Sequence, residues 1–185
     1  MKHKNMLGWD IGGAHLKAAL INEAGELVTV YQHPCPLWQG LEQLQRAAKN
    51  ILQQIDSPCH RHAITMTGEL VDLFADRDDG VQHIVATMNE LLAGQSCLVF
   101  AGINGFIAID QITPAHYLAI ASANWLASAT YAAQQIGSGL FVDIGSTTTD
   151  ILLLQHHTVQ AQGYTDYQRL VSKEDRKSTR LNSSH

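Results

Sequence analysis

The chain has 185 residues, of which 45% are hydrophobic and 16% charged, and its formal net charge is −5. These proportions are typical of a globular protein, and no apolar run is long enough to span a bilayer. An acidic balance without Lys/Arg clusters removes any electrostatic reason to expect nucleic acid or an anionic membrane as a partner. Three well-separated cysteines and an N-terminus without a signal-peptide pattern predict a soluble cytoplasmic protein with reduced thiols.

The first half of the chain is predicted to form three strands, then helix, strand, helix and strand. These elements lie at residues 6–11, 16–21, 27–31, 37–55, 62–67, 81–92 and 96–101. We expect residues 78–80 to cap the second helix.

The second half adds a short strand within 105–110 and a helical turn at Thr113-Pro114. An Ala-rich helix follows at 122–136, and two more strands are expected at 139–144 and 149–155. Strands that alternate with helices in this way predict an α/β fold with a mixed sheet.

Two Asp-x-Gly turns, 133 residues apart, carry the clearest chemical signal. Asp10 precedes Gly12-Gly13 and Asp143 precedes Gly145, each between two apolar strands. Glycine permits a close approach of the backbone to a ligand, and free amides and hydroxyls bind phosphate oxygens. The aspartate can hold hydrated Mg²⁺ or orient a water. One such turn is equally typical of an ordinary hairpin, but two copies predict two related domains that face one cleft.

This pair of turns resembles the two phosphate hairpins of the actin-like ATPase superfamily, which includes sugar kinases, heat-shock ATPases, and hydantoinase and oxoprolinase enzymes. The resemblance implies a ribonuclease H-like domain over residues 1–137, with the first phosphate hairpin. It also implies the first hairpin of a second, truncated copy over 138–174.

Residues 175–185 match the translation of a common sequencing adapter, so we expect an artefact there rather than a natural disordered basic tail. The gene product would then continue beyond Glu174. Because a cleft enzyme needs both walls and an unpaired second hairpin exposes apolar strands, we expect this fragment alone to be inactive and poorly soluble.

The resemblance assigns catalysis and Mg²⁺ binding to Asp10 and Asp143. The candidates for phosphate binding are Gly12, Gly13, His15, Lys17, Gly145, Ser146, Thr147 and Thr148. Of these, Lys17 resembles the phosphate-contacting lysine of the superfamily, whereas His15 stands where hydantoinase-like enzymes and kinases often carry Thr or Ser. Structural alternatives stay open: Asp10 as a turn residue, Lys17 as an edge lysine and His15 as a solvated turn residue.

A second group of polar residues follows the predicted strand at 62–67. Ligand sites in α/β sheets lie off the carboxyl ends of strands, so this group is placed to meet a substrate. The candidates are Thr67, Gly68, Glu69 and Asp72, with Asn124 at the start of the Ala-rich helix. A polar strand-to-loop transition and a helix cap are the structural alternatives.

Four segments together narrow the resemblance to one branch of the hydantoinase A/oxoprolinase-like proteins. They are residues 8–17, 65–72, 121–125 and 142–150. The branch is linked to tetrahydromethanopterin-dependent C1 transfer and is similar to the methanofuran-core synthase. It implies a transferase in which a phenol oxygen displaces pyrophosphate from a furan-methyl diphosphate.

Two other functions remain open from the sequence. The same cleft would serve ATP in an amide-ring hydrolase or a small-molecule kinase, so the ligand is either ATP or a diphosphate substrate, with Mg²⁺. A non-catalytic nucleotide-sensing module is the other alternative. In each case we expect a small phosphorylated molecule as ligand, and the oligomeric state is left open.

Overall fold

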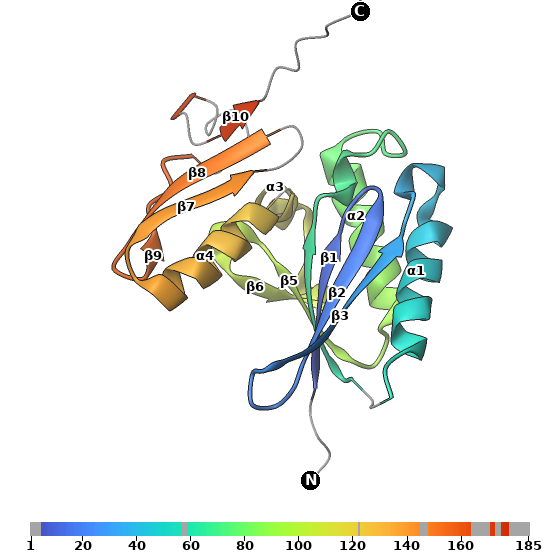
Figure 1. Ribbon diagram of the computed structural model, residues 1–185. Helices are drawn as coiled ribbons and strands as arrows, with labels where there is room; N and C mark the ends of the chain where they lie inside the picture. Colours follow the sequence, from blue (N-terminus) through green and yellow to red (C-terminus); the bar gives the residue numbers. More distant parts are fainter. Residues whose placement is uncertain are drawn as a thin grey trace, which may run out of the picture. The chain divides into compact units, whose positions relative to one another are not determined.

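The computed structural model divides into two compact units, Met1–Asn124 and Trp125–His185 (Figure 1). The residues it describes are 5–56, 59–121, 123–144, 148–163, 171–172 and 175–177. The boundary between the units falls at the start of helix α4 (Asn124–Ile136), between Asn124 and Trp125, whereas the sequence predicts a boundary at the end of this helix, at residue 137. The end of α4 is tied to the strands that follow, because the His157 amide donates to the Gly137 carbonyl at 2.7 Å.

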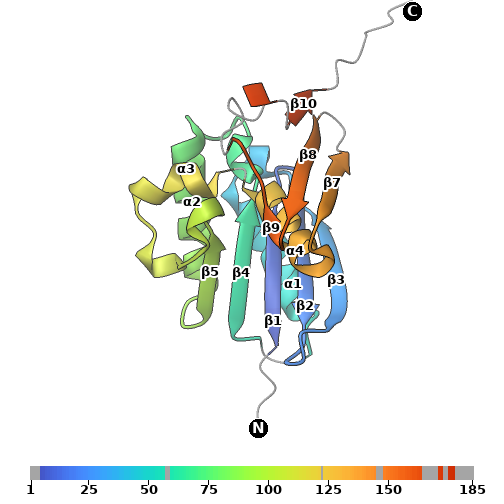
Figure 2. The same cartoon turned by 90° about the vertical axis from the view of Figure 1, so that its left-hand side faces the viewer.

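The first unit is built on a six-stranded mixed sheet with the order β3-β2-β1-β4-β5-β6. Strands β1, β4 and β5 are parallel, and β2, β3 and β6 pair antiparallel with their neighbours. Figure 2 shows β3 to β5 side by side in this order. The strands are β1 (Met6–Ile11), β2 (His15–Ile21), β3 (Leu27–Pro34), β4 (Arg61–Met66), β5 (Ser96–Phe100) and β6 (Phe106–Ala108). This confirms the predicted α/β class and the order of elements.

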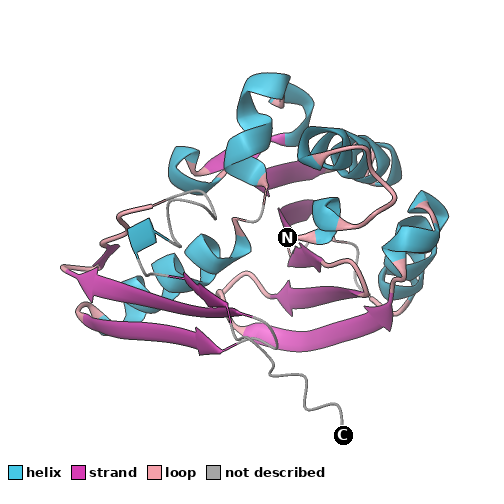
Figure 3. Cartoon of the chain, turned by 90° about the horizontal axis from the view of Figure 1, so that it is seen from above, coloured by secondary structure: helices cyan, strands magenta, loops and turns pink. Residues whose placement is uncertain are grey.

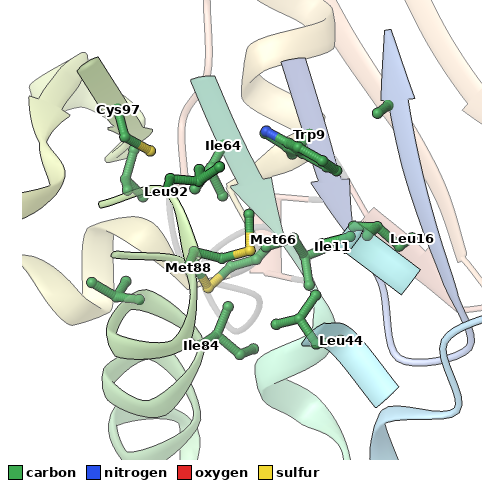
Figure 4. Close-up of a cluster of buried hydrophobic side chains, with 14 of the residues drawn as sticks. Trp9, Ile11, Leu16, Leu44, Ile64, Met66, Ile84, Met88, Leu92 and Cys97 are labelled. Carbon is green, nitrogen blue, oxygen red and sulfur yellow. The ribbon is translucent and has the colours of Figure 1, made fainter. Parts of the chain in front are cut away.

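Helices α1 (Leu41–Gln53) and α2 (Arg77–Leu91) supply much of the apolar core of this unit. Figure 4 shows their buried side chains beside those of β1, β2 and β4, among them Leu44, Ile84 and Met88. The apolar residues of each helix recur three or four positions apart, so one stripe is buried. A short helix α3 (Tyr117–Ile120) follows, and short 3-10 helices lie at Leu37–Gln39, Gly68–Leu70, Gly102–Asn104, Ile109–Gln111 and Pro114–His116.

Both main helices begin at a different residue from the one predicted. Helix α1 starts at Leu41, after Gly40 with a φ of 137°, and a separate 3-10 turn occupies residues 37–39. Helix α2 starts at Arg77, and its cap is Asp76, whose side chain accepts from the Asp79 amide at 2.8 Å. The prediction that 78–80 form the cap was therefore wrong. Those residues lie in the first turn, where acidic side chains are favoured by the helix dipole.

A buried histidine links β4 to the strand that carries Asp10. The Trp9 indole Nε1 donates to His62 Nδ1 at 3.1 Å, so His62 Nε2 carries the proton toward Gln95 Oε1 at 2.6 Å. His62 is 2% exposed. Burial lowers the pKa of His62 below its ordinary value of 6.5, and the Gln95 hydrogen bond opposes this shift.

The second unit contains helix α4 and a small antiparallel sheet (Figure 3, strands in magenta). Strand β8 pairs with β7, β9 and β10. Residues 175–177 form β10, although the sequence predicts no element there. The strands are β7 (Gly139–Ile144), β8 (Thr148–Gln155), β9 (Thr158–Val159) and β10 (Asp175–Lys177). Strands β7 and β8 pair antiparallel, and a second copy of the fold stays a prediction. None of the described helices has the length and hydropathy needed to cross a membrane.

Candidate phosphate and substrate site

The turn between β1 and β2 leaves backbone donors available. The Gly12 amide closes the turn on the His15 carbonyl at 3.1 Å, and the carbonyls of Gly13 and Ala14 accept from the segment after β3. Among the described residues, no protein acceptor takes the amide of Gly13 or of Ala14. Two successive free amides at a turn are suited to an anion, and His15 lies exposed beside them.

The glycines of this turn are required by close packing rather than by a positive φ. A Cβ on Gly13 would lie 2.6 Å from Val71 Cγ1, and one on Gly68 would lie 2.8 Å from Leu37 Cδ2 and 3.2 Å from the Ile11 carbonyl. The Thr67 amide also donates to that carbonyl at 2.9 Å. The structure therefore brings the first turn and the end of β4 together.

Asp10 and Lys17 form an ion pair across β1 and β2. They are cross-strand partners in the register, and Lys17 Nζ lies 3.3 Å from Asp10 Oδ2. The other carboxylate oxygen, Oδ1, is buried and has no hydrogen-bond partner within the described part of the chain. A buried acceptor without a donor is costly, and a water or a ligand donor at this atom would remove that cost.

The four substrate candidates after β4 separate in the structure. Thr67 and Gly68 lie against the first turn. Glu69 is 1% exposed and packs against α2, where a Cβ on Gly80 would lie 2.8 Å from Glu69 Cβ. Asp72 is exposed. Contacts of these residues with a substrate stay a prediction.

In the second hairpin, as in the first, the aspartate pairs with a residue seven positions further along the chain, but here that residue is acidic. Asp143 lies directly opposite Asp150, seven residues on, as Asp10 lies opposite Lys17. Like charges directly opposite each other destabilise a strand pair. The predicted phosphate ligands Gly145, Ser146 and Thr147, and the side chain of Thr148, lie outside the described residues.

Two further expectations concern Asn124 and metal ligands. Asn124 is half-buried at the start of α4 and ends the first unit, so its part in the site stays a prediction. Across the described ranges, no three His, Cys, Asp or Glu side chains gather into a metal-binding group. A magnesium ion here would therefore depend on one or two carboxylates, water and phosphate oxygens, which is its usual coordination in phosphate sites.

The sequence reasoning missed a hollow of about 520 Å³ beside Asp10. It lies on the face of the first sheet that is turned away from the buried side chains of β1. The signal was present as small residues at alternate positions of three strands, Gly8, Ala19 and Ala63, but only the strand register shows that they are neighbours.

Comparison with known proteins agrees with the resemblance found in the motifs. Residues 61–180 match the Hydantoinase/oxoprolinase family. The chain is 31% identical over 171 residues to a synthase of Methanocaldococcus jannaschii, whose named product is a furan methanamine carrying a gamma-L-glutamylaminoethyl-phenoxymethyl group. The match covers 91% of this chain and 49% of that protein, so the chain spans about half the length of this relative.

Solved structures give more distant likenesses. A Ppx/GppA family protein of Aquifex aeolicus has a TM-score of 0.49 at 10% identity, over 86% of this chain and 50% of that one. The ethanolamine utilization protein EutJ of Carboxydothermus hydrogenoformans has a TM-score of 0.48 at 16% identity, over 86% of this chain and 50% of that one. A polyphosphate/ATP-glucomannokinase of Arthrobacter has a TM-score of 0.47 at 14% identity, over 87% of this chain and 62% of that one. Scores below 0.5 establish neither a shared fold nor a function for this chain.

Proposed function

Because the chain belongs to the hydantoinase/oxoprolinase family, we propose that it carries the phosphate-binding hairpins of a transferase that displaces pyrophosphate in the synthesis of a methanofuran-type C1-carrier cofactor. The observation that carries the proposal is the first hairpin. It presents two free turn amides and Lys17 beside Asp10.

These groups suit a reaction in which negative charge develops on a leaving diphosphate. The amides of Gly13 and Ala14 and the Lys17 ammonium are donors for diphosphate oxygens, and fixed donors stabilise such charge as the bond breaks. The named product of the M. jannaschii relative contains an ether between a phenyl and a furan-methyl group. A phenol oxygen that attacks a furan-methyl carbon would form this bond.

Magnesium would be held on Asp143, with the Asp150 carboxylate opposite it in the strand pair. Lys17, 3.3 Å from Asp10 Oδ2, disfavours a divalent cation bound directly to Asp10, so a cation held at Asp10 would be bound through water. When bound, the ion would supply neutralisation of the diphosphate charge.

The test begins with sequencing of the source locus across the codon for Glu174. If the reading frame continues, the longer protein is supplied with a furan-methyl diphosphate and a tyramine derivative, and pyrophosphate release is measured. We expect release to require the phenol, and we expect Asp10→Asn and Asp143→Asn each to lower the rate by about 100-fold or more.

Two outcomes would contradict the proposal. Phosphate release from ATP, without pyrophosphate release from the diphosphate, would favour an ATP-dependent hydrolase or a kinase. Unchanged biological activity in the Asp10→Asn/Asp143→Asn double variant would favour the sensing module. Lys49→Met, at an exposed position of α1, controls for the general effect of changing a surface charge.

A further inference from the structure

Two parallel rows of side chains cross the face of the first sheet away from the core. The burial pattern of β1 alternates, so Gly8 and Asp10 lie on the opposite face from its buried residues. The register places Ala19 and Ala63 on either side of Gly8. The next row on the same face is polar and consists of Lys17, Asp10 and Thr65.

The row of small residues forms the floor of the hollow beside Asp10. Val30 and Gln32 of β3 line one side and Phe106 of β6 lines another. The volume of about 520 Å³ is in the range of about 300–1,000 Å³ that is typical of small-molecule sites. A flat apolar group with one polar end therefore fits over the row of small residues, with its polar end toward the polar row.

The polar row sets the chemistry of that end. Asp10 Oδ1 is buried and lacks a donor among the described residues, while Oδ2 is taken by Lys17. The Thr65 hydroxyl donates to the Trp9 carbonyl at 3.3 Å, so it offers only acceptor capacity to a ligand. A neutral O–H donor would satisfy Asp10 Oδ1, whereas a fully ionised diphosphate has no hydrogen to donate there.

We propose that this hollow binds a flat aromatic ring that carries a hydroxyl group, with the ring over Gly8, Ala19 and Ala63 and the hydroxyl donating to Asp10 Oδ1. The assignment rests on the proposed function, for which it supplies the binding site of the acceptor phenol. Lys17, beside the same carboxylate, would stabilise the phenol oxygen as it loses its proton to Asp10.

The first experiment compares two probes on the unaltered 185-residue chain by ligand-observed NMR at low micromolar protein. The probes are tyramine and phenethylamine, which differ only in the phenolic hydroxyl. We expect tyramine to bind about tenfold more tightly, as is typical of a hydrogen bond to a charged group. Equal affinities would overturn the proposal without any variant.

Two variants locate the site. Ala63→Leu fills the floor of the hollow and should abolish tyramine binding, while Ala93→Leu, the same change at an exposed position after α2, should leave it unchanged. Asp10→Ala should remove the preference for tyramine over phenethylamine. Tyramine binding that survives Ala63→Leu would place the ring elsewhere.

Failure of this inference can be told apart from failure of the proposed function. Tyramine binding with the expected variant pattern, but without pyrophosphate release in the longer protein, would keep the aromatic site and reject the transferase. Phenol-dependent pyrophosphate release that is indifferent to Ala63→Leu would keep the transferase and reject this site.

Discussion

At the scale of single residues, Lys17 is the charged side chain that the first hairpin places beside Asp10. A lysine inside an apolar return strand is unexpected from the pattern, and the register shows its reason, since it lies opposite Asp10. The pair is partly exposed, with side-chain exposures of 57% and 35%. Solvent screens such a pair, so its main value is the charge that it presents to a ligand rather than its stability.

Replacing Lys17 should separate these two contributions. We expect Lys17→Met to cost less than about 1 kcal/mol of unfolding free energy, as is usual for a partly exposed ion pair. The same change should weaken pyrophosphate binding, because the only ammonium beside Asp10 that the structure records is removed. Urea unfolding and calorimetric titration with pyrophosphate would measure the two effects. Lys49→Met is the matched control, and an equal loss of binding in that variant would contradict the assignment.

His62 should make the first unit sensitive to acid. Burial lowers the pKa of His62 in the folded chain, so the unfolded chain takes up the proton first as the pH falls through about 6.5. The unfolding free energy should therefore be constant, as far as His62 contributes, above that pH and should fall below it. The nearby His60 acts in the same direction.

Urea unfolding between pH 7.5 and 5.0 would measure this dependence. In His62→Gln the fall should be smaller, since the titrating group is gone while a hydrogen-bonding side chain remains. His83→Gln, at a histidine whose side chain is 48% exposed, is the control for the same change outside the core. A slope that is unchanged in His62→Gln would show that other groups cause it.

At the scale of elements, the first turn and the segment after β4 act as one unit. The sequence predicts both as ligand-binding segments and predicts glycine for tight bending. The structure gives a different reason for Gly13, because Val71 fills the space where its Cβ would lie. Local pattern does not show this reason, since the two residues are far apart in the sequence.

Gly13→Ala should therefore destabilise the first unit by about 1–3 kcal/mol, the usual cost of overpacking. The Gly13→Ala/Val71→Ala double variant should recover part of that loss relative to the two single changes, because the smaller side chain frees the space. Thermal unfolding of the four chains would measure the coupling. Strict additivity would show that Gly13 is required for another reason.

At the scale of the whole chain, the second unit exposes apolar side chains along β7 and β8. Leu140, Val142, Ile144 and Leu153 are 61%, 47%, 76% and 52% exposed. Exposed apolar strands favour association, which is the physical basis for expecting poor solubility. The chain spans about half the length of the M. jannaschii relative that it matches.

Introducing charge on these strands should improve the behaviour of the chain. We expect Leu140→Lys/Ile144→Lys to reduce self-association in light scattering and gel filtration, since lysine on exposed strands opposes edge pairing. Glu23→Lys/Glu26→Lys, two changes at exposed turn positions, is the control for net charge. If the unaltered chain is monodisperse at high concentration, the prediction of self-association is wrong.

The sequence by itself determined the order of strands and helices, the α/β class and the two Asp-x-Gly turns, because each depends on periodicity or on residues that are adjacent in the chain. The start of α2 was predicted at the wrong residue, since several acidic residues near Asp76 are each compatible with a first turn. Only the tertiary structure decided that Lys17 faces Asp10, that Val71 fills the space beside Gly13 and that small residues of three strands form one row. Those relations depend on strand register and on packing between distant segments, which no local pattern encodes.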